Sequence, residues 1–260
     1  MKTTLKTSIR ISGSLAVGAL LLFGTQVQAQ DYTDDFNDGD DAGWTRDSLF
    51  TLSFGQTWSA ASGAYQMTEP QGGYGGYGYV GSFAPGIQGA NVLVKSDVVA
   101  FQGPGGYAAI FLAARVDPLT LGVPLGLTGY ALAWEPYGNS FTGDMEILRI
   151  GPPAVFNGLG TVALTLNPLL DYTFVLSCAG SLITGEIWEV GGLSALASIS
   201  AVDGIYGSGL SGLGMLGETP MPVGDVTWDN FSSEVPEPGS AALLGLGVLG
   251  FLVRRIWPKK

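Results

Sequence analysis

The sequence predicts an all-β domain, a β-sandwich of about 12 strands, between residues 30 and 234. Short runs rich in Val, Ile, Tyr, Phe and Thr recur along this stretch, separated by Gly, Pro, Asn and Asp. Glycine accounts for 41 of the 260 residues, and a packed helical domain would not tolerate so much backbone entropy. Many short strands at this spacing favour a sandwich, and the length suits one domain with a large core.

Each expected strand is such a run, bounded by turn-forming residues. In chain order, the expected strands are residues 57–60, 64–68, 77–82, 91–101, 107–116, 130–134, 144–150, 161–166, 172–179, 182–190, 210–216 and 226–231. The segment 193–200 has no clear helix cap and is compatible with either a helix or a strand. No internal repeat of fixed period is present.

The first 29 residues have the three parts of a signal peptide. Lys2, Lys6 and Arg10 form a basic start without acids, and residues 11–24 are uncharged and mostly apolar. Ala29 then supplies the small residue that cleavage requires. We expect residues 1–29 to form a signal helix, to engage the Sec translocon and to be removed by signal peptidase. The alternative is a retained N-terminal anchor.

Residues 235–260 combine a rigid linker, a short apolar segment and a basic end. The linker is Val235-Pro236-Glu237-Pro238, and its prolines favour an extended chain that presents Glu237 to solvent. The apolar run lies within residues 240–253, the expected transmembrane helix, which spans about 20 Å against a hydrocarbon core of roughly 30 Å. Arg254 and Arg255 follow and favour a cytoplasmic C-terminus.

This order of parts resembles the PEP-CTERM sorting signal of Gram-negative bacteria. The resemblance implies a protein that is exported, held transiently in the inner membrane, and then processed near residues 236–238 by an exosortase. It also implies a final location at the cell surface or in the extracellular matrix, in cells that make exopolysaccharide and biofilm. A plain C-terminal membrane anchor is the alternative.

The expected domain is strongly acidic. Residues 30–234 contain four Lys and Arg residues against 21 Asp and Glu residues, which gives a net charge of −17. Such a surface repels nucleic acid and anionic lipid and favours cations such as calcium. The single cysteine, Cys178, excludes an internal disulfide. It lies in an apolar run and is expected to be buried, the alternative being a reactive or intermolecular thiol.

Both ends of the domain resemble concanavalin A-like (laminin G-like) jelly rolls. The opening residues that carry the resemblance are Asp34-Asp35-Phe36-Asn37-Asp38, Gly43-Trp44, Thr57-Trp58-Ser59 and Gly63-Ala64-Tyr65. The closing ones are residues 172–176, 179–182, 186–188, 209–214 and 226–231. In such a sandwich the first and last strands lie side by side.

This pairing predicts a candidate calcium site. Asp34 or Asp35 would approach Asp229, and like carboxylates at that range are unfavourable without a cation. The resemblance implies a structural calcium ion here in some family members, and Asp35 and Asp229 are the expected ligands. The alternative is that residues 34–41 form a solvated acidic loop.

Catalysis is not expected. The chain has no histidine, which removes Ser-His-Asp and Cys-His nucleophile activation and every His-ligated metal. Asp144 and Glu146 share one face of an expected strand, roughly 7 Å apart by strand rise, and two such acids could hydrolyse a glycoside. The surrounding residues lack the leading and trailing Glu of laminarinase-like enzymes, and solvent-facing charges explain the same pattern.

Two aromatic clusters are candidates for binding carbohydrate by ring stacking. Tyr74, Tyr77 and Tyr79 lie in a glycine-rich stretch, and Trp134 opens a second cluster at residues 134–139. The alternatives are a hairpin with locally packed tyrosines and a core tryptophan. The favoured function is a non-catalytic structural or adhesive role associated with exopolysaccharide. A lectin-like carbohydrate-binding module and a glycoside hydrolase are the alternatives.

Overall fold

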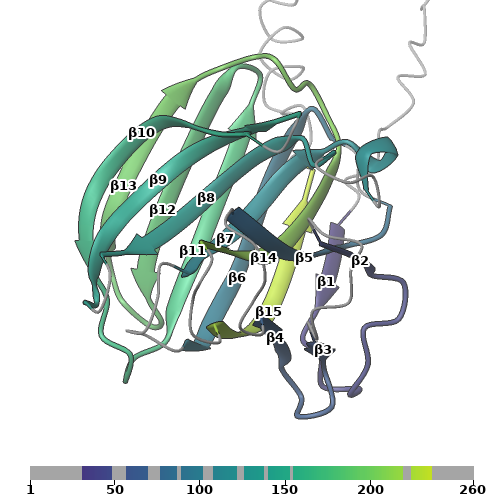
Figure 1. Cartoon of the computed structure of the whole chain (residues 1–260), viewed down its shortest axis with the longest axis vertical. Helices are drawn as coiled ribbons and strands as arrows, with labels where there is room; N and C mark the ends of the chain where they lie inside the picture. The colour runs from purple at the N-terminus through teal and green to yellow at the C-terminus, as the bar shows by residue number, and fades with distance from the viewer. Residues whose placement is uncertain are drawn as a thin grey trace, which may run out of the picture.

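The fold is a two-layer β-sandwich (Figure 1). The computed structural model describes residues 31–48, 57–69, 77–86, 89–101, 108–121, 126–137, 140–152, 155–218 and 224–235. These residues form fifteen β-strands and one short 3-10 helix, η1 (Pro118–Thr120). Every strand pairing in both sheets is antiparallel. The all-β prediction is confirmed.

One layer is an eight-stranded sheet. Its hydrogen-bonded order is β13 (Ala195–Val202), β12 (Leu182–Glu189), β11 (Tyr172–Ala179), β6 (Asn91–Phe101), β15 (Gly224–Glu234), β4 (Tyr65–Glu69) and β3 (Thr57–Ser59), and β1 (Asp31–Asp34) pairs with β15. Its strands alternate between buried and partly exposed residues, as the pattern of β11 shows most regularly. One face therefore packs on the core and the other is open to solvent.

The other layer is a seven-stranded sheet. Its order is β10 (Val155–Thr165), β9 (Thr142–Gly151), β8 (Gly129–Pro136), β7 (Ala108–Val116), β14 (Leu210–Glu218), β5 (Tyr77–Phe83) and β2 (Thr45–Ser48). At one side of the sandwich the edge strands β10 and β13 lie together (Figure 1). This contact covers the open side of the core.

The strand count is a correction to the sequence prediction of about 12. The three additional strands are β1, β2 and β13. β1 and β2 have four residues each and contain Asp, which is rare in strands, so propensity alone does not find them. β13 covers most of the ambiguous segment 193–200 and resolves it as a strand.

The core between the sheets is aromatic and aliphatic. Phe174 and Trp228 meet edge to face with ring centroids 5.7 Å apart. Cys178 is buried in the same cluster, which confirms its expected place, and burial raises the pKa of its thiol to about 11. A thiol protonated at neutral pH behaves as a small apolar side chain.

The seven-stranded sheet carries a second buried apolar cluster on part of its other face. Phe111 and Phe83 belong to this cluster, and they lie across Gly214 and Gly212. A Cβ atom at Gly214 would come within 2.1 Å of the Phe111 ring. These glycines thus let large rings lie flat on the sheet, which explains part of the high glycine content.

The two ends of the domain lie side by side. Asp31 of β1 is in register with Glu234 of β15, so the chain enters and leaves at the same end of the sandwich. Among the residues that the structure describes, no helix has the length and apolar character needed to cross a membrane. The expected signal helix (1–29) and transmembrane segment (240–253) lie outside the described residues.

Candidate functional site: the outer face of the eight-stranded sheet

The first and last strands pair as the jelly-roll resemblance implies. Asp34 of β1 is opposite Phe231 of β15, and Asp35 follows directly. Burial raises the pKa of Asp229, and the charges of Asp97 and Asp35 raise it further, against a hydrogen bond from the Asn230 N–H. The two carboxylates expected as calcium ligands are therefore close enough to repel each other.

The described residues do not fit a preformed calcium cage. Asp34 accepts hydrogen bonds from the indole Nε1 of Trp44 at 2.8 Å, the Tyr32 hydroxyl and the Phe36 N–H. Asp35 Oδ1 accepts from the Asn37 N–H. No three or more acidic, His or Cys side chains of the described part gather at one point as metal ligands would. Calcium binding stays a prediction of the sequence.

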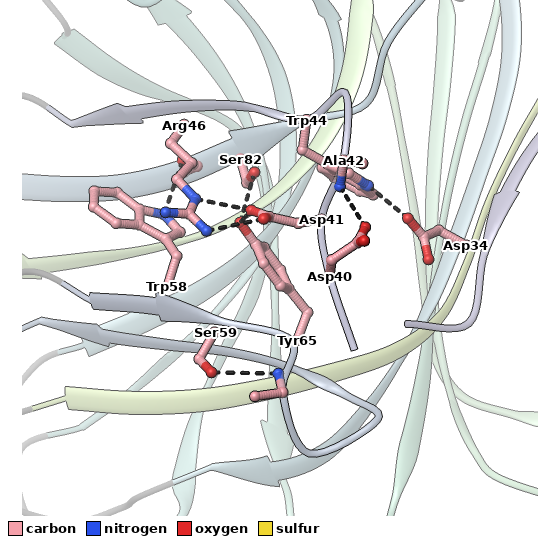
Figure 2. A network of polar contacts seen from close by, with 12 residues as sticks. Asp34, Asp40, Asp41, Ala42, Trp44, Arg46, Trp58, Ser59, Tyr65 and Ser82 are labelled. Atoms are coloured by element: carbon pink, nitrogen blue, oxygen red, sulfur yellow. Dashed lines mark hydrogen bonds and ion pairs between the residues drawn. The ribbon is translucent and has the colours of Figure 1, made fainter. Parts of the chain in front are cut away.

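Residues 34–41 are more than a solvated acidic loop. Asp41 binds both the Nε and one terminal nitrogen of Arg46, at 2.8 and 2.9 Å, and accepts from the Tyr65 hydroxyl at 2.8 Å (Figure 2). The Arg46 guanidinium also lies 5.8 Å from the centre of the Trp58 ring. These contacts fasten the segment that crosses from one sheet to the other.

This fastening predicts an acid-sensitive fold. Burial opposes ionisation of Asp41, but hydrogen bonds from Arg46 and Tyr65 outweigh it, so the pKa of Asp41 is lowered. A lowered carboxyl pKa gives stability that is present above the unfolded pKa, about 4, and is lost as the pH falls below it. We expect the urea concentration at the unfolding midpoint to decrease when the pH is lowered below about 4, and to decrease less in the Asp41→Asn variant. Asp31→Asn, at an exposed position, is the control, and its urea midpoint should decrease with falling pH as much as that of the parent protein.

An open groove lies beside this segment. It has a volume of about 580 Å³, and its lining is Tyr32, Thr33, Asp34, Asp35, Asp38, Asp40, Ala42, Asn230, Phe231 and Ser232. Asn230 has a left-handed backbone (φ 51°) at a shift in the pairing of β15 with β6. Its side-chain amide donates to Asp97 Oδ2 at 3.0 Å. The groove therefore opens onto the outer face of the eight-stranded sheet.

A row of polar side chains and one indole continues across that face. Asp229 is in register with Asp97, Asp97 with Thr173, and Thr173 with Trp188, and directly opposed residues share a face. The Thr173 hydroxyl donates to Asp97 Oδ1 at 2.6 Å, and the Trp188 Nε1–H donates to Glu186 Oε2 at 2.9 Å. All five of these side chains are partly exposed. We call this set, together with Asn230, the Trp188 row.

Two residues expected to bind carbohydrate are in fact buried. Trp134 is 1% exposed, and its Nε1–H donates to the Leu164 carbonyl. Tyr79 is also 1% exposed, with its hydroxyl bound to Asp47. Neither ring can stack on a sugar, so the core alternative for Trp134 is correct. Tyr74 and the side chain of Tyr77 lie outside the described residues.

The candidate acid pair does share one face of β9, as expected. Asp144 and Glu146 are both partly exposed on the outer side of the seven-stranded sheet. Burial and the charge of Asp144 raise the pKa of Glu146, against a hydrogen bond from Thr161. The Tyr137 hydroxyl hydrogen-bonds Asp144, which raises the pKa of Tyr137. The sequence places these residues in separate clusters, and the structure joins them.

The expected sorting residues begin where the last strand ends. Val235 follows β15 and packs against Gly89, where an added Cβ would come within 2.7 Å of the valine. Pro236, Glu237, Pro238, Arg254 and Arg255 lie outside the described residues. The last strand of the fold thus leads directly into this segment.

Comparison with known proteins decides the nature of this segment. A protein-family model described as "PEP-CTERM protein-sorting motif" matches residues 234–256. The chain ends in a PEP-CTERM motif. No curated protein matches the chain in sequence. The PEP-CTERM motif accounts for the end of the chain, and the rest is compared through its fold.

The fold of this PEP-CTERM chain is that of lectins and carbohydrate-binding modules. It is similar to the CBM2 module of the evolved Dit of Lactobacillus casei BL23 phage J-1, at a TM-score of 0.59 and 13% identity over 81% of this chain and 97% of that chain. For basic winged bean lectin with Tn-antigen, the TM-score is 0.52 and the sequence identity 9%, over 82% of this chain and 100% of that chain. For lectin II from Ulex europaeus, the TM-score is 0.51 and the sequence identity 10%, over 80% of this chain and 99% of that chain. These similarities establish a jelly-roll, lectin-like sandwich.

Proposed function

We propose that this protein is an exported exosortase substrate with a non-catalytic, carbohydrate-associated adhesive role at the cell surface or in the extracellular matrix of a Gram-negative bacterium. The Sec translocon and signal peptidase would act on residues 1–29, and an exosortase would act near residues 236–238. The single observation that carries the proposal is the PEP-CTERM motif that begins at Glu234, the last residue of β15, in a lectin-like sandwich. Exopolysaccharide is the proposed partner.

The surface of the domain is compatible with a binding role. The Trp188 row offers one partly exposed indole beside carboxylate, hydroxyl and amide groups, the combination that sugar recognition uses. A flat face of a rigid sheet also holds such groups in fixed positions. Binding therefore requires no further chemistry from the chain.

Retention on immobilised polysaccharides tests the adhesive role. We expect the mature protein, isolated from its own cells, to be retained by at least one neutral or amino-sugar polysaccharide. A non-lectin protein of similar negative charge is the control and should pass through. If no polysaccharide retains the mature protein, the carbohydrate-associated role is wrong.

Glycoside hydrolysis is the second candidate, because Glu146 has a raised pKa beside Asp144 on one strand face. It requires turnover of a polysaccharide by the mature protein and loss of that turnover in both Asp144→Asn and Glu146→Gln. Unchanged turnover in both variants, or none in the parent protein, would remove this candidate and leave the non-catalytic proposal.

A further inference from the structure

The indole of Trp188 is a fixed aromatic surface on the outside of the sandwich. Its neighbours along β12, Ile187 and Ile183, point into the core, so alternation turns the indole outward. The hydrogen bond from Nε1 to Glu186 restrains the ring. A restrained, partly exposed ring suits stacking against a sugar face, because little side-chain freedom remains to be lost on binding.

The ring stands at the end of a row of hydrogen-bonding groups. From Trp188 to Asp229 the row crosses β11 and β6 to reach β15, which is three inter-strand steps, or roughly 14 Å. Thr173 donates a hydrogen bond to one carboxylate oxygen of Asp97, and Asn230 donates to the other. Each oxygen can accept a further hydrogen bond from a ligand. Beyond Asn230 the row runs into the groove. Row and groove together suit an extended chain better than a single small ligand.

The charge of this surface selects the chemistry of that chain. Glu186, Asp97, Asp229 and Asp35 are carboxylates on or beside the row, and the groove adds further aspartates. Among the described residues, the cation on this face is Lys95, which lies two residues before Asp97 on β6. Charge repulsion between Asp229 and its neighbours means that a positive group placed here would be favoured. A uronic acid chain would be repelled.

We propose that the Trp188 row and the adjoining groove bind a polysaccharide whose sugars carry protonated amino groups. This inference rests on the proposed function and assigns its ligand class and site. Trp188 stacks on a sugar ring, and the carboxylates of Asp97 and Asp229 receive the ammonium and hydroxyl donors. A bare metal ion would use the carboxylates but would leave the indole without a role.

Titration of the mature protein with oligosaccharides of β-1,4-linked glucosamine tests this assignment. We expect binding that weakens with added salt and falls by about tenfold in Trp188→Ala and in Asp97→Asn, while Trp188→Phe retains most of it. Asp31→Asn removes the same charge at an exposed position that belongs neither to the row nor to the lining of the groove, and it should keep most of the parent's binding. The N-acetylated oligosaccharide, which lacks the charge, should bind more weakly.

Several outcomes would overturn the assignment. Equal affinity of parent, Trp188→Ala and Asp97→Asn would show that the chain binds elsewhere, although a carbohydrate-binding function would stand. Equal or tighter binding of oligogalacturonate would contradict the ligand class. Binding of calcium alone to this face, with no glucosamine chain bound, would replace the ligand by a metal ion. If the protein binds no glycan of any class, the proposed function fails together with the site.

Discussion

Replacing Trp134 by alanine is expected to lower the free energy of unfolding by about 3–5 kcal/mol. The indole is fully inside the sandwich, meets Phe101 edge to face at 5.5 Å, and donates to the Leu164 carbonyl at 3.1 Å. Alanine would remove this packing and leave both a cavity and a carbonyl without its donor. Urea unfolding followed by circular dichroism measures the change.

Trp188→Ala is the matched comparison. This indole is partly exposed on the outer sheet face, so its removal should cost about 1 kcal/mol or less of unfolding free energy. Comparison of the two variants should thus distinguish a loss of stability, expected in Trp134→Ala, from a loss of glycan binding, expected in Trp188→Ala. A stable Trp134→Ala variant with weakened glycan binding would contradict the placement of Trp134 in the core.

Replacing residues 236–238 by three alanines is expected to abolish release of the protein from the membrane. Proline restricts the backbone and favours an extended chain, and alanine at residues 236–238 removes this restriction together with the Glu237 carboxylate. Cell fractionation and the mass of the mature C-terminus measure the result. The unprocessed chain should accumulate in the membrane fraction.

A charge-preserving change at the other end of the motif is the control. Arg254→Lys with Arg255→Lys keeps the positive charges that would favour a cytoplasmic C-terminus, so we expect this variant to be released as the parent protein is. Normal release of the alanine variant would show that residues 236–238 are not the processing site. Recovery of the wild-type chain with residue 1 still attached would contradict export itself.

Much of the fold could be predicted from local pattern. β6, β11 and β12 are runs rich in β-branched, aromatic and other apolar residues, and their bounds match the sequence prediction closely. β1 and β2 could not be found in this way, because they are held by pairing with β15 and β5 and by the contacts of Asp34 and Asp41. Such contacts are visible only once the chain is folded.

The candidate site was harder to predict than the fold. Trp134 and Tyr79 look like surface aromatics in the sequence because glycine and polar residues flank them, but Trp134 packs in the core between the sheets and Tyr79 in the buried cluster on the other face of the seven-stranded sheet. Trp188, which we propose as the stacking residue, was not singled out from the sequence, although its alternation with Ile187 and Ile183 signals an outward ring. Its partners Asp97 and Asp229 come from distant parts of the chain, so pairing register was needed to find them.

The pairing of Asp31 with Glu234 has a mechanical consequence. β15 lies inside its sheet, bonded to β6 on one side and to β4 and β1 on the other, and the PEP-CTERM motif begins at its last residue. A ligand bound at Trp188 on β12 and a pull on the chain beyond Glu234 would draw β12 and β15 along the strand axis, while the ladder bonds between the strands run across it. Tension would then load these bonds together in shear rather than peel them one at a time, which suits a domain that resists flow.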